Sequence, residues 1–257
     1  MPFEVLWIRM SLLLGVNIDH VATLRQARYA KTPDSPHAEP CVVAAGHDAL
    51  AGGADSLTLH VRGDRRHMQE ADALRIRAEI PLPLNLEMGV TGEMVGMALK
   101  LKPDFVCLVP EARMEITTEG GLDVLAGLAN IRTVVACLQN AGIKVSLFVD
   151  PDLKQIAAAA ATRAQMIELH TGGLSNASDD TVATEMSRLI DAAMAGHAAG
   201  LQVNAGHGIN YTNITRILTI PHLAELNIGH SIVARAVRVG MTAAVREMKD
   251  LMADYPA

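Results

Sequence analysis

The chain has 257 residues, of which half are hydrophobic and only 3% are aromatic. Apolar content built mainly from Ala, Leu, Val, Ile and Met is typical of parallel strands packed under helices. The net charge is −6 and there is no basic run, which argues against a nucleic-acid partner. No stretch approaches the roughly 18 apolar residues that a membrane span needs, so no membrane partner is expected.

Cysteine usage indicates the compartment. Cys41, Cys107 and Cys137 are odd in number and form no CxxC pair, which disfavours a disulfide framework or a zinc knuckle. We therefore expect a cytoplasmic protein.

At the N-terminus, Arg9 interrupts the apolar stretch and no small-residue cleavage site follows, so a signal peptide is not expected. Residues 1–11 are predicted to be an extension outside the folded core.

Short apolar runs alternate along the chain with stretches that suit helices. Eight predicted strands cover 12–19, 55–61, 82–88, 104–111, 144–150, 165–171, 201–206 and 224–229. Candidate helices cover 41–52, 69–79, 92–101, 121–141, 152–163, 179–199, 211–219 and 231–252.

This alternation predicts an α/β fold with a parallel sheet, and the length suits a closed (β/α)8 TIM barrel with additional helices. An open doubly wound sheet is the alternative, although no GxGxxG follows the first strand. No linker or low-complexity segment suggests a boundary, so residues 1–257 are expected to form a single domain. The long helices predicted at 121–141 and 179–199 are candidates for subunit contacts.

The predicted strands carry polar residues where a buried parallel strand should be apolar. Side chains alternate between the two faces of a strand, so these residues share one face while their neighbours form an apolar face. The sets are Asn17 with Asp19, Thr58 with His60 and Arg62, Asn85 with Glu87, and Glu168 with His170, with Asn204 and Asn227 in comparable places. In a barrel that polar face is the interior and its mouth, where active sites lie.

Two regions are candidates for anion binding, one after the second strand and one after the last two strands. HVRGDRRH (60–67) places three arginines after the second strand, and the planar guanidinium suits phosphate oxygens. NAGHG (204–208) and NIGH (227–230) follow the last two strands, where barrels often bind phosphate through backbone N–H groups. The alternatives are a solvated charged loop for the first and ordinary turns for the second.

Acid–base chemistry is expected from His60, Glu87 and His207. Burial in an apolar strand should raise the pKa of Glu87 toward neutrality, as a general acid or base requires. The two histidines are expected to titrate near neutral pH. The alternative for Glu87 is a buried ion pair with an arginine. Histidines also stand at other strand ends, but no HxH or HExxH occurs, so no metal is expected.

At these residues the sequence resembles the pyridoxine 5′-phosphate synthase family. The resemblance spans roughly residues 12–252, and several motifs occur in the family's order. They are GVNIDHVATLRQAR (15–28), HVRGDRRH (60–67), NLEM (85–88), LVPEARMEITTEGGLDV (108–124), SLFVD (146–150), IELHTG (167–172), VNAGHG (203–208) and ELNIGHSIVARAV (225–237).

The resemblance implies that 3-amino-2-oxopropyl phosphate condenses with 1-deoxy-D-xylulose 5-phosphate to give pyridoxine 5′-phosphate, phosphate and water. It implies no metal or organic cofactor and a homo-octamer. Motif by motif, it implies that His60 and Glu87 accept protons and His207 donates one. The implied aminoketone-phosphate contacts are Asn17, Arg28, Gly208, Gly229 and His230. The implied deoxyxylulose-phosphate contacts are Asp19, His20, Arg62, His67 and Thr117.

Two other functions are compatible with parts of this pattern. Another phosphosugar barrel enzyme, an isomerase or epimerase, would need one phosphate site rather than two. A non-catalytic carrier of pyridoxine phosphate would keep the anion sites but would not need His60, Glu87 and His207 together.

Overall fold

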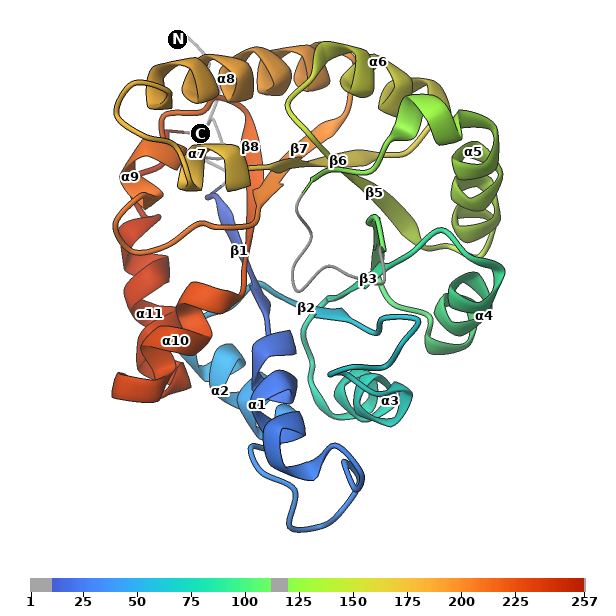
Figure 1. Ribbon diagram of the computed structural model, residues 1–257, viewed down its shortest axis with the longest axis vertical. Coiled ribbons are helices and arrows are strands. Elements are labelled where there is room, and N and C mark those ends of the chain that lie inside the picture. The colour runs from blue at the N-terminus through green and yellow to red at the C-terminus, as the bar shows by residue number, and fades with distance from the viewer. Residues whose placement is uncertain (1–10, 112–119, 257) are drawn as a thin grey trace, which may run out of the picture.

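A closed parallel barrel forms the centre of the molecule. The computed structural model describes residues 11–111 and 120–256. Within them, each strand pairs with the next in chain order and β8 pairs with β1, as Figure 1 shows. The strands are β1 Leu13–Asn17, β2 Ser56–His60, β3 Leu84–Met88, β4 Phe105–Leu108, β5 Lys144–Val149, β6 Met166–His170, β7 Gln202–Gly206 and β8 Leu223–Ile228. The predicted TIM barrel is confirmed.

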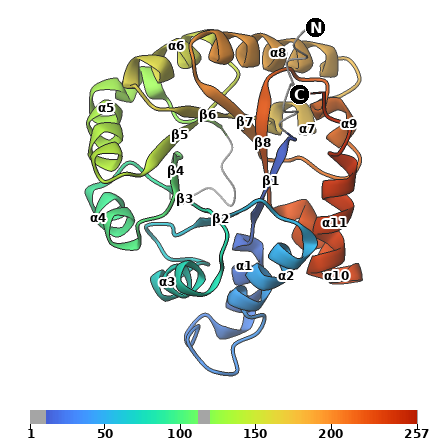
Figure 2. The ribbon, with the colours of Figure 1, turned by 180° about the vertical axis from the view of Figure 1, so that it is seen from behind.

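Helices surround the barrel on its outside (Figures 1 and 2). They are α1 Asp19–Tyr29, α2 Val42–Gly52, α3 Glu70–Glu79, α4 Gly92–Leu101, α5 Val124–Asn140, α6 Leu153–Thr162, α7 Gly172–Ser175, α8 Val182–Ala198, α9 Ile214–Ile217, α10 His230–Val239 and α11 Met241–Leu251. Val16, Leu59, Leu86 and Ile167 are fully buried in the hydrophobic core. Their positions fit the apolar strand face that the alternation predicts. Because these residues alternate with the polar ones, the polar set is left to the barrel interior.

The structure differs from the sequence prediction in its helices at three places. Residues 19–29 form α1, which the sequence pattern does not predict, because the segment is rich in polar residues and lacks an apolar periodicity. The predicted helix over 231–252 is divided into α10 and α11 at Gly240, whose φ of 84° and ψ of 154° lie outside helical geometry. The short α7 follows β6, where its two glycines give little sequence signal for a helix.

A buried ion pair holds α1 against the segment that leads into α3. The guanidinium of Arg25 donates to both carboxylate oxygens of Asp72, at 2.7 and 2.8 Å, and to the backbone oxygen of His67 at 3.2 Å. Asp72 also accepts from the backbone N–H of Gln69, which caps α3. The pair therefore fixes the middle of α1 against the first turn of α3 and the end of the loop after β2.

None of the helices in the described residues is both long enough and apolar enough to span a membrane.

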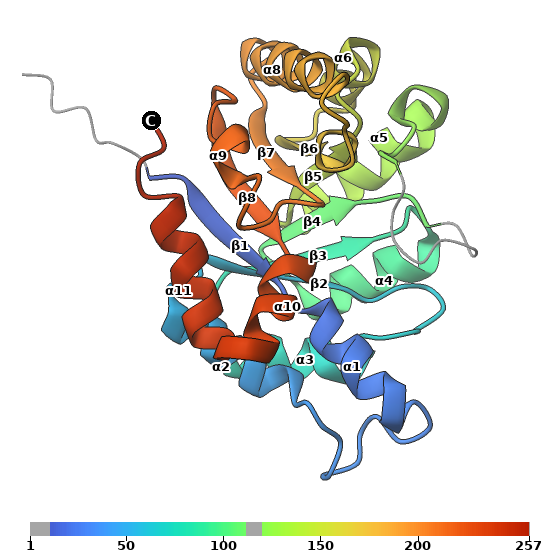
Figure 3. The same cartoon turned by 60° about the vertical axis from the view of Figure 1, so that its left-hand side comes forward.

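Figure 3 shows that α1 and α10 lie side by side. Helix α1 begins directly after β1, and α10 begins directly after the neighbouring strand β8. The N-terminal ends of both helices are thus brought to the same end of the barrel.

Candidate active site

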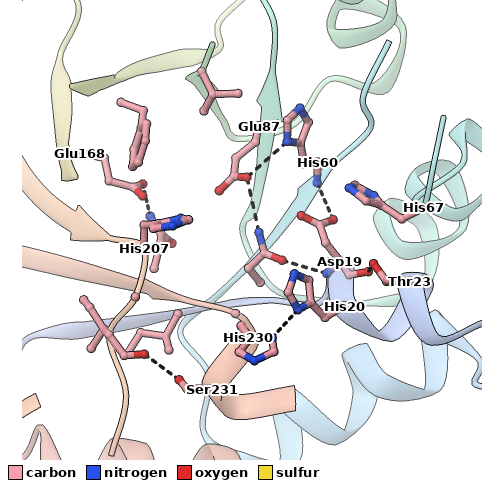
Figure 4. A pocket seen from close by; sticks show the side chains of 18 of the residues that line it. Asp19, His20, Thr23, His60, His67, Glu87, Glu168, His207, His230 and Ser231 are labelled. Carbon is pink, nitrogen blue, oxygen red and sulfur yellow. Dashed lines mark hydrogen bonds and ion pairs between the residues drawn. The ribbon is translucent and has the colours of Figure 1, made fainter. Parts of the chain in front are cut away.

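A cavity of about 670 Å³ opens at the carboxyl ends of the strands (Figure 4). It brings together eleven of the residues that the sequence predicts for the site. They are Asn17, Asp19, His20, His60, Arg62, His67, Glu87, His207, Gly208, Gly229 and His230. The lining also includes Thr23, Arg66, Val109, Phe148, Glu168, Ile209, Asn210, Asn227, Ile228 and Ser231.

Two predicted residues are not among those that line the cavity. Arg28 lies on the exposed side of α1, where its guanidinium carbon is 5.9 Å from the centre of the Tyr29 ring. Arg28 stands in the last turn of α1 and is exposed, whereas Arg25 is buried. Thr117 lies outside the residues that the structure describes.

Asn17 and Asp19 connect β1 to β2 and to the start of α1. The side-chain oxygen of Asn17 accepts from the backbone N–H of Asp19 at 2.8 Å. One carboxylate oxygen of Asp19 accepts from the backbone N–H of His60, also at 2.8 Å. The first residue of α1 therefore fixes the end of β2, and with it the position of His60.

Glu87 faces His60 across the cavity floor. Its Oε2 lies 3.8 Å from Nδ1 of His60 and accepts a long hydrogen bond of 3.5 Å from the amide of Asn17. Burial raises the pKa of Glu87 well above its ordinary value, and the negative charges of Asp19 and Glu168 raise it further. The shift has the direction that the sequence predicts, and a carboxyl group that holds its proton more readily is suited to general acid–base catalysis.

His207 departs from the prediction that it titrates near neutral pH. Burial, together with the neighbouring His170 and His20, lowers the pKa of His207 to about 4. The ring centroids of His207 and His170 are 5.0 Å apart. A positive φ of 72° at His207 turns the chain after β7 and brings this ring into the cavity. In the ligand-free protein the imidazole is therefore neutral at physiological pH.

Glu168 adds a second carboxyl group to the cavity. The alternation in β6 places it in the polar layer, but only the tertiary structure shows its partners. It accepts from Nδ2 of Asn227 at 2.6 Å, and burial raises its pKa to about 7. Glu168 is thus close to half protonated at neutral pH and can either donate or accept a proton.

The stability of the protein should report this shift. Glu168 keeps its proton up to about pH 7 when folded, whereas an ordinary glutamate loses it near 4.5. Its contribution to stability is present below pH 4.5 and is lost as the pH rises through 7. Glutamine cannot ionise, so Glu168→Gln does not lose this contribution. The free energy of unfolding of the variant minus that of the unmodified protein should therefore rise by up to about 3 kcal/mol as the pH rises from 4.5 to 8.

Urea unfolding at several pH values in that range measures this difference. Glu79→Gln, which removes an exposed carboxylate on α3, is the matched control and should show no such gain. A pH-independent difference between Glu168→Gln and the unmodified protein would contradict the expectation.

Two arginines and a histidine line the wall formed by the end of β2 and its loop. Arg62, Arg66 and His67 reach the cavity there. Arg66 donates to Asp64, and Nε of Arg62 lies 3.6 Å from the same carboxylate. Arg65 belongs to the same predicted cluster but is not among the lining residues, because it donates to Glu70 and Glu93. Only part of the predicted arginine cluster therefore faces the cavity.

The opposite wall comes from the segments that follow β7 and β8. Gly208, Gly229, His230 and Ser231 line it, and α10 begins at His230. Backbone N–H groups at a helix N-terminus favour an anion. Nδ1 of His20 and Nδ1 of His230 lie 2.8 Å apart, so one ring donates to the other. Burial and the charge of His230 lower the pKa of His20.

Metal ligation finds little support in residues 11–111 and 120–256. In these ranges no group of three or more His, Cys, Asp or Glu side chains is arranged to hold a metal ion. The chemistry that the described side chains offer is proton transfer, hydrogen bonding and anion binding.

The fold and the cavity together define a class of protein. A parallel (β/α)8 barrel with carboxyl and imidazole groups at its carboxyl-end mouth is a barrel enzyme equipped for acid–base catalysis. Two cationic or N–H-rich walls make the cavity suitable for anionic substrates.

Comparison with known proteins gives the family. Residues 14–254 match the family model described as "Pyridoxal phosphate biosynthesis protein PdxJ", and the chain belongs to this family. The pyridoxine 5′-phosphate synthase of Akkermansia muciniphila is 59% identical over 239 residues, covering 93% of this chain and 97% of that protein. That of Thermosynechococcus vestitus is 52% identical, covering 93% and 98%.

Solved structures agree on the fold alone. A phosphoribosylanthranilate isomerase from Thermotoga maritima is 12% identical with a TM-score of 0.58, covering 94% of this chain and 98% of that one. A tryptophan synthase from Mycobacterium tuberculosis is 11% identical with a TM-score of 0.63, covering 97% and 94%. At these identities the likeness supports the barrel and says nothing about the reaction.

Proposed function

We propose that the chain condenses 3-amino-2-oxopropyl phosphate with 1-deoxy-D-xylulose 5-phosphate to give pyridoxine 5′-phosphate, phosphate and water. One observation carries the proposal. The motif residues His60, Glu87 and His207, far apart in a sequence that belongs to the PdxJ family, meet at one cavity. The relatives named pyridoxine 5′-phosphate synthase match nearly the whole chain, which supports the same reaction here.

Both substrates carry a phosphate, and the cavity has two walls that suit anions. The aminoketone phosphate is assigned to Asn17, Gly208, Gly229 and His230, where the start of α10 offers backbone N–H groups. The deoxyxylulose phosphate is assigned to the other wall and to the start of α1. Its contacts there are Asp19, His20, Arg62 and His67. Ligands on opposite walls would bring their reactive carbon and nitrogen atoms to the middle of the cavity.

The proton carriers fit the bonds that must break. Condensation of an amine with a ketone releases water, and aromatisation of the ring requires removal of carbon-bound protons. His60 and Glu87, which face each other at 3.8 Å, are assigned as proton acceptors. His207 is assigned as the proton donor. A bound phosphate dianion would raise its low pKa, because a nearby negative charge favours the imidazolium form.

The proposed reaction needs neither a metal ion nor an organic cofactor, because each step is a proton transfer, an addition or an elimination. We also propose a cytoplasmic homo-octamer. Apolar side chains on adjacent helices support subunit contact: Leu24 on α1 is 55% exposed and Val237 on α10 is 76% exposed. Native mass spectrometry measures the number of subunits directly.

One assay tests the proposed activity. The purified protein is incubated with both substrates, and pyridoxine 5′-phosphate and released phosphate are followed together. Both products should appear in equal amounts, and neither should appear when one substrate is omitted. A carrier would bind pyridoxine 5′-phosphate without making it, and an isomerase would convert a single phosphosugar. The absence of product under several buffer conditions would refute the synthase proposal.

A further inference from the structure

Glu111, directly after β4, joins the ends of three neighbouring strands. Its Oε1 lies 2.7 Å from Nε2 of His60 and accepts from the backbone N–H of Gly89 at 3.2 Å. Its Oε2 accepts from the backbone N–H of Gly63 at 3.1 Å. Glu111 is 16% exposed and His60 is 7% exposed at the side chain. Glu111 is not among the cavity-lining residues, and its direct hydrogen-bonding contact with a proposed proton carrier is the one to His60.

We infer that Glu111 is a positioning residue that holds His60 in the Nε2–H tautomer and thereby directs its basic Nδ1 toward Glu87. The inference deepens the proposed function and rests on it for the role of His60 as a proton acceptor. The arrangement of carboxylate, imidazole and reacting group is one that orients a general base in many enzymes.

The tautomer follows from the hydrogen-bonding capacity of a carboxylate. An ionised carboxylate only accepts, and Glu111 already accepts from two backbone N–H groups. Partial burial opposes its ionisation, but the hydrogen bonds from His60 and Gly63 leave the pKa of Glu111 below its ordinary value. The proton between Glu111 and His60 therefore belongs to Nε2, and the lone pair of the neutral imidazole is on Nδ1.

Other ionisable groups also lie near His60, but each is farther from its ring nitrogens than Glu111 is or contacts its backbone instead. Glu87 lies on the Nδ1 side at 3.8 Å, farther than Glu111 on the Nε2 side. Asp19 binds the backbone N–H of His60 rather than its ring. The His67 ring is 6.1 Å away between centroids. Arg62 acts on Glu111 by helping to lower its pKa. Glu111 is thus the ring's direct hydrogen-bonding partner.

Two glycines leave the room that the Glu111 carboxylate occupies. A Cβ atom at position 89 would lie 3.0 Å from the carboxyl carbon of Glu111, and one at position 63 would lie 3.3 Å from its Oε2. Both flanking strand ends therefore carry a glycine where the carboxylate approaches the backbone. This close approach allows Glu111 to reach His60 from the next strand but one.

The experiment measures His60 by nitrogen-detected NMR in the ligand-free protein, with His60→Asn assigning the resonances. The unmodified protein should show the Nε2–H tautomer. In Glu111→Gln the side-chain amide can donate to Nε2 as well as accept from it, so the two tautomers should mix. Glu111→Asp keeps the charge and should restore part of the effect. Glu70→Gln, which removes an exposed carboxylate bound to Arg65, should leave His60 unchanged.

Turnover provides the second readout. Glu111→Gln should lose about 10- to 100-fold in kcat, less than a fully buried orienting carboxylate would, with KM for both substrates changed little. Glu111→Asp, which keeps the acceptor, should recover part of the lost kcat. Thermal unfolding of each variant separates this from loss of folding, because Glu111→Gln keeps the size of the side chain.

An unchanged tautomer of His60 in Glu111→Gln would overturn the inference, whatever the activity. Unchanged turnover despite a shifted tautomer, in an enzyme that makes product, would overturn it as well. Since the NMR readout needs no substrate, failure of the unmodified protein to make pyridoxine 5′-phosphate refutes the proposed function separately.

Discussion

Replacing Glu87 with glutamine is expected to lower turnover by roughly 100- to 10,000-fold, the range that a general acid or base contributes. Glutamine keeps the shape of the side chain and can still accept from Asn17, but it cannot carry a proton to or from His60. Substrate binding should change little, because neither of the two walls proposed to bind phosphate includes position 87. Single-turnover kinetics and the dissociation constant of inorganic phosphate measure the two effects.

The control for this variant is Glu93→Gln. Glu93 is 66% exposed and binds Arg65 away from the cavity lining, so its replacement should leave kcat unchanged within about twofold. Normal turnover in Glu87→Gln would refute the role assigned to Glu87. A large loss of phosphate affinity without loss of kcat would assign Glu87 to binding instead of catalysis.

Replacing Arg25 with alanine is expected to destabilise the protein by about 3–5 kcal/mol. The change leaves Asp72 buried without its cation, and removing one partner from a buried ion pair costs more than the pair itself contributes. It also removes the hydrogen bond to the backbone of His67. Urea unfolding at neutral pH, monitored by circular dichroism, gives the free energy directly.

Two comparisons make this second prediction specific. Arg75→Ala breaks an exposed pair with Glu79 and should cost less than about 1 kcal/mol. Combining Arg25→Leu with Asp72→Leu removes both charges, so the double variant should be more stable than Arg25→Leu alone. A loss below 1 kcal/mol in Arg25→Ala would mean that Asp72 is solvated when its partner is missing.

Most of the fold was predicted from the alternation of apolar runs with helix-compatible stretches, because this pattern is a local property that the tertiary structure preserves. The eight strands lie within about two residues of their predicted ends or fall inside the predicted ranges. The exceptions are segments whose local signal is weak or misleading. The polar sequence of α1 has no clear apolar face, and Gly240 divides a pattern that otherwise continues from α10 into α11.

For the site, the sequence could predict which strand positions are polar but not which groups meet. Glu111 and His60 are adjacent only because β2, β3 and β4 pair side by side, so no spacing in the chain reveals their contact. Arg28 and Arg25 share a motif, yet Arg28 is exposed and Arg25 forms a buried ion pair with Asp72, which the sequence does not distinguish.

The sequence by itself determined an alternating α/β barrel, a polar layer at its mouth and the upward direction of the pKa of Glu87. Each follows from residue type and from period-two alternation, which act along the chain. Only the tertiary structure decided the low pKa of His207, the pKa of Glu168 near 7 and the contact between Glu111 and His60. These depend on burial and on charges brought from distant strands, and such through-space effects exist only once the barrel has closed.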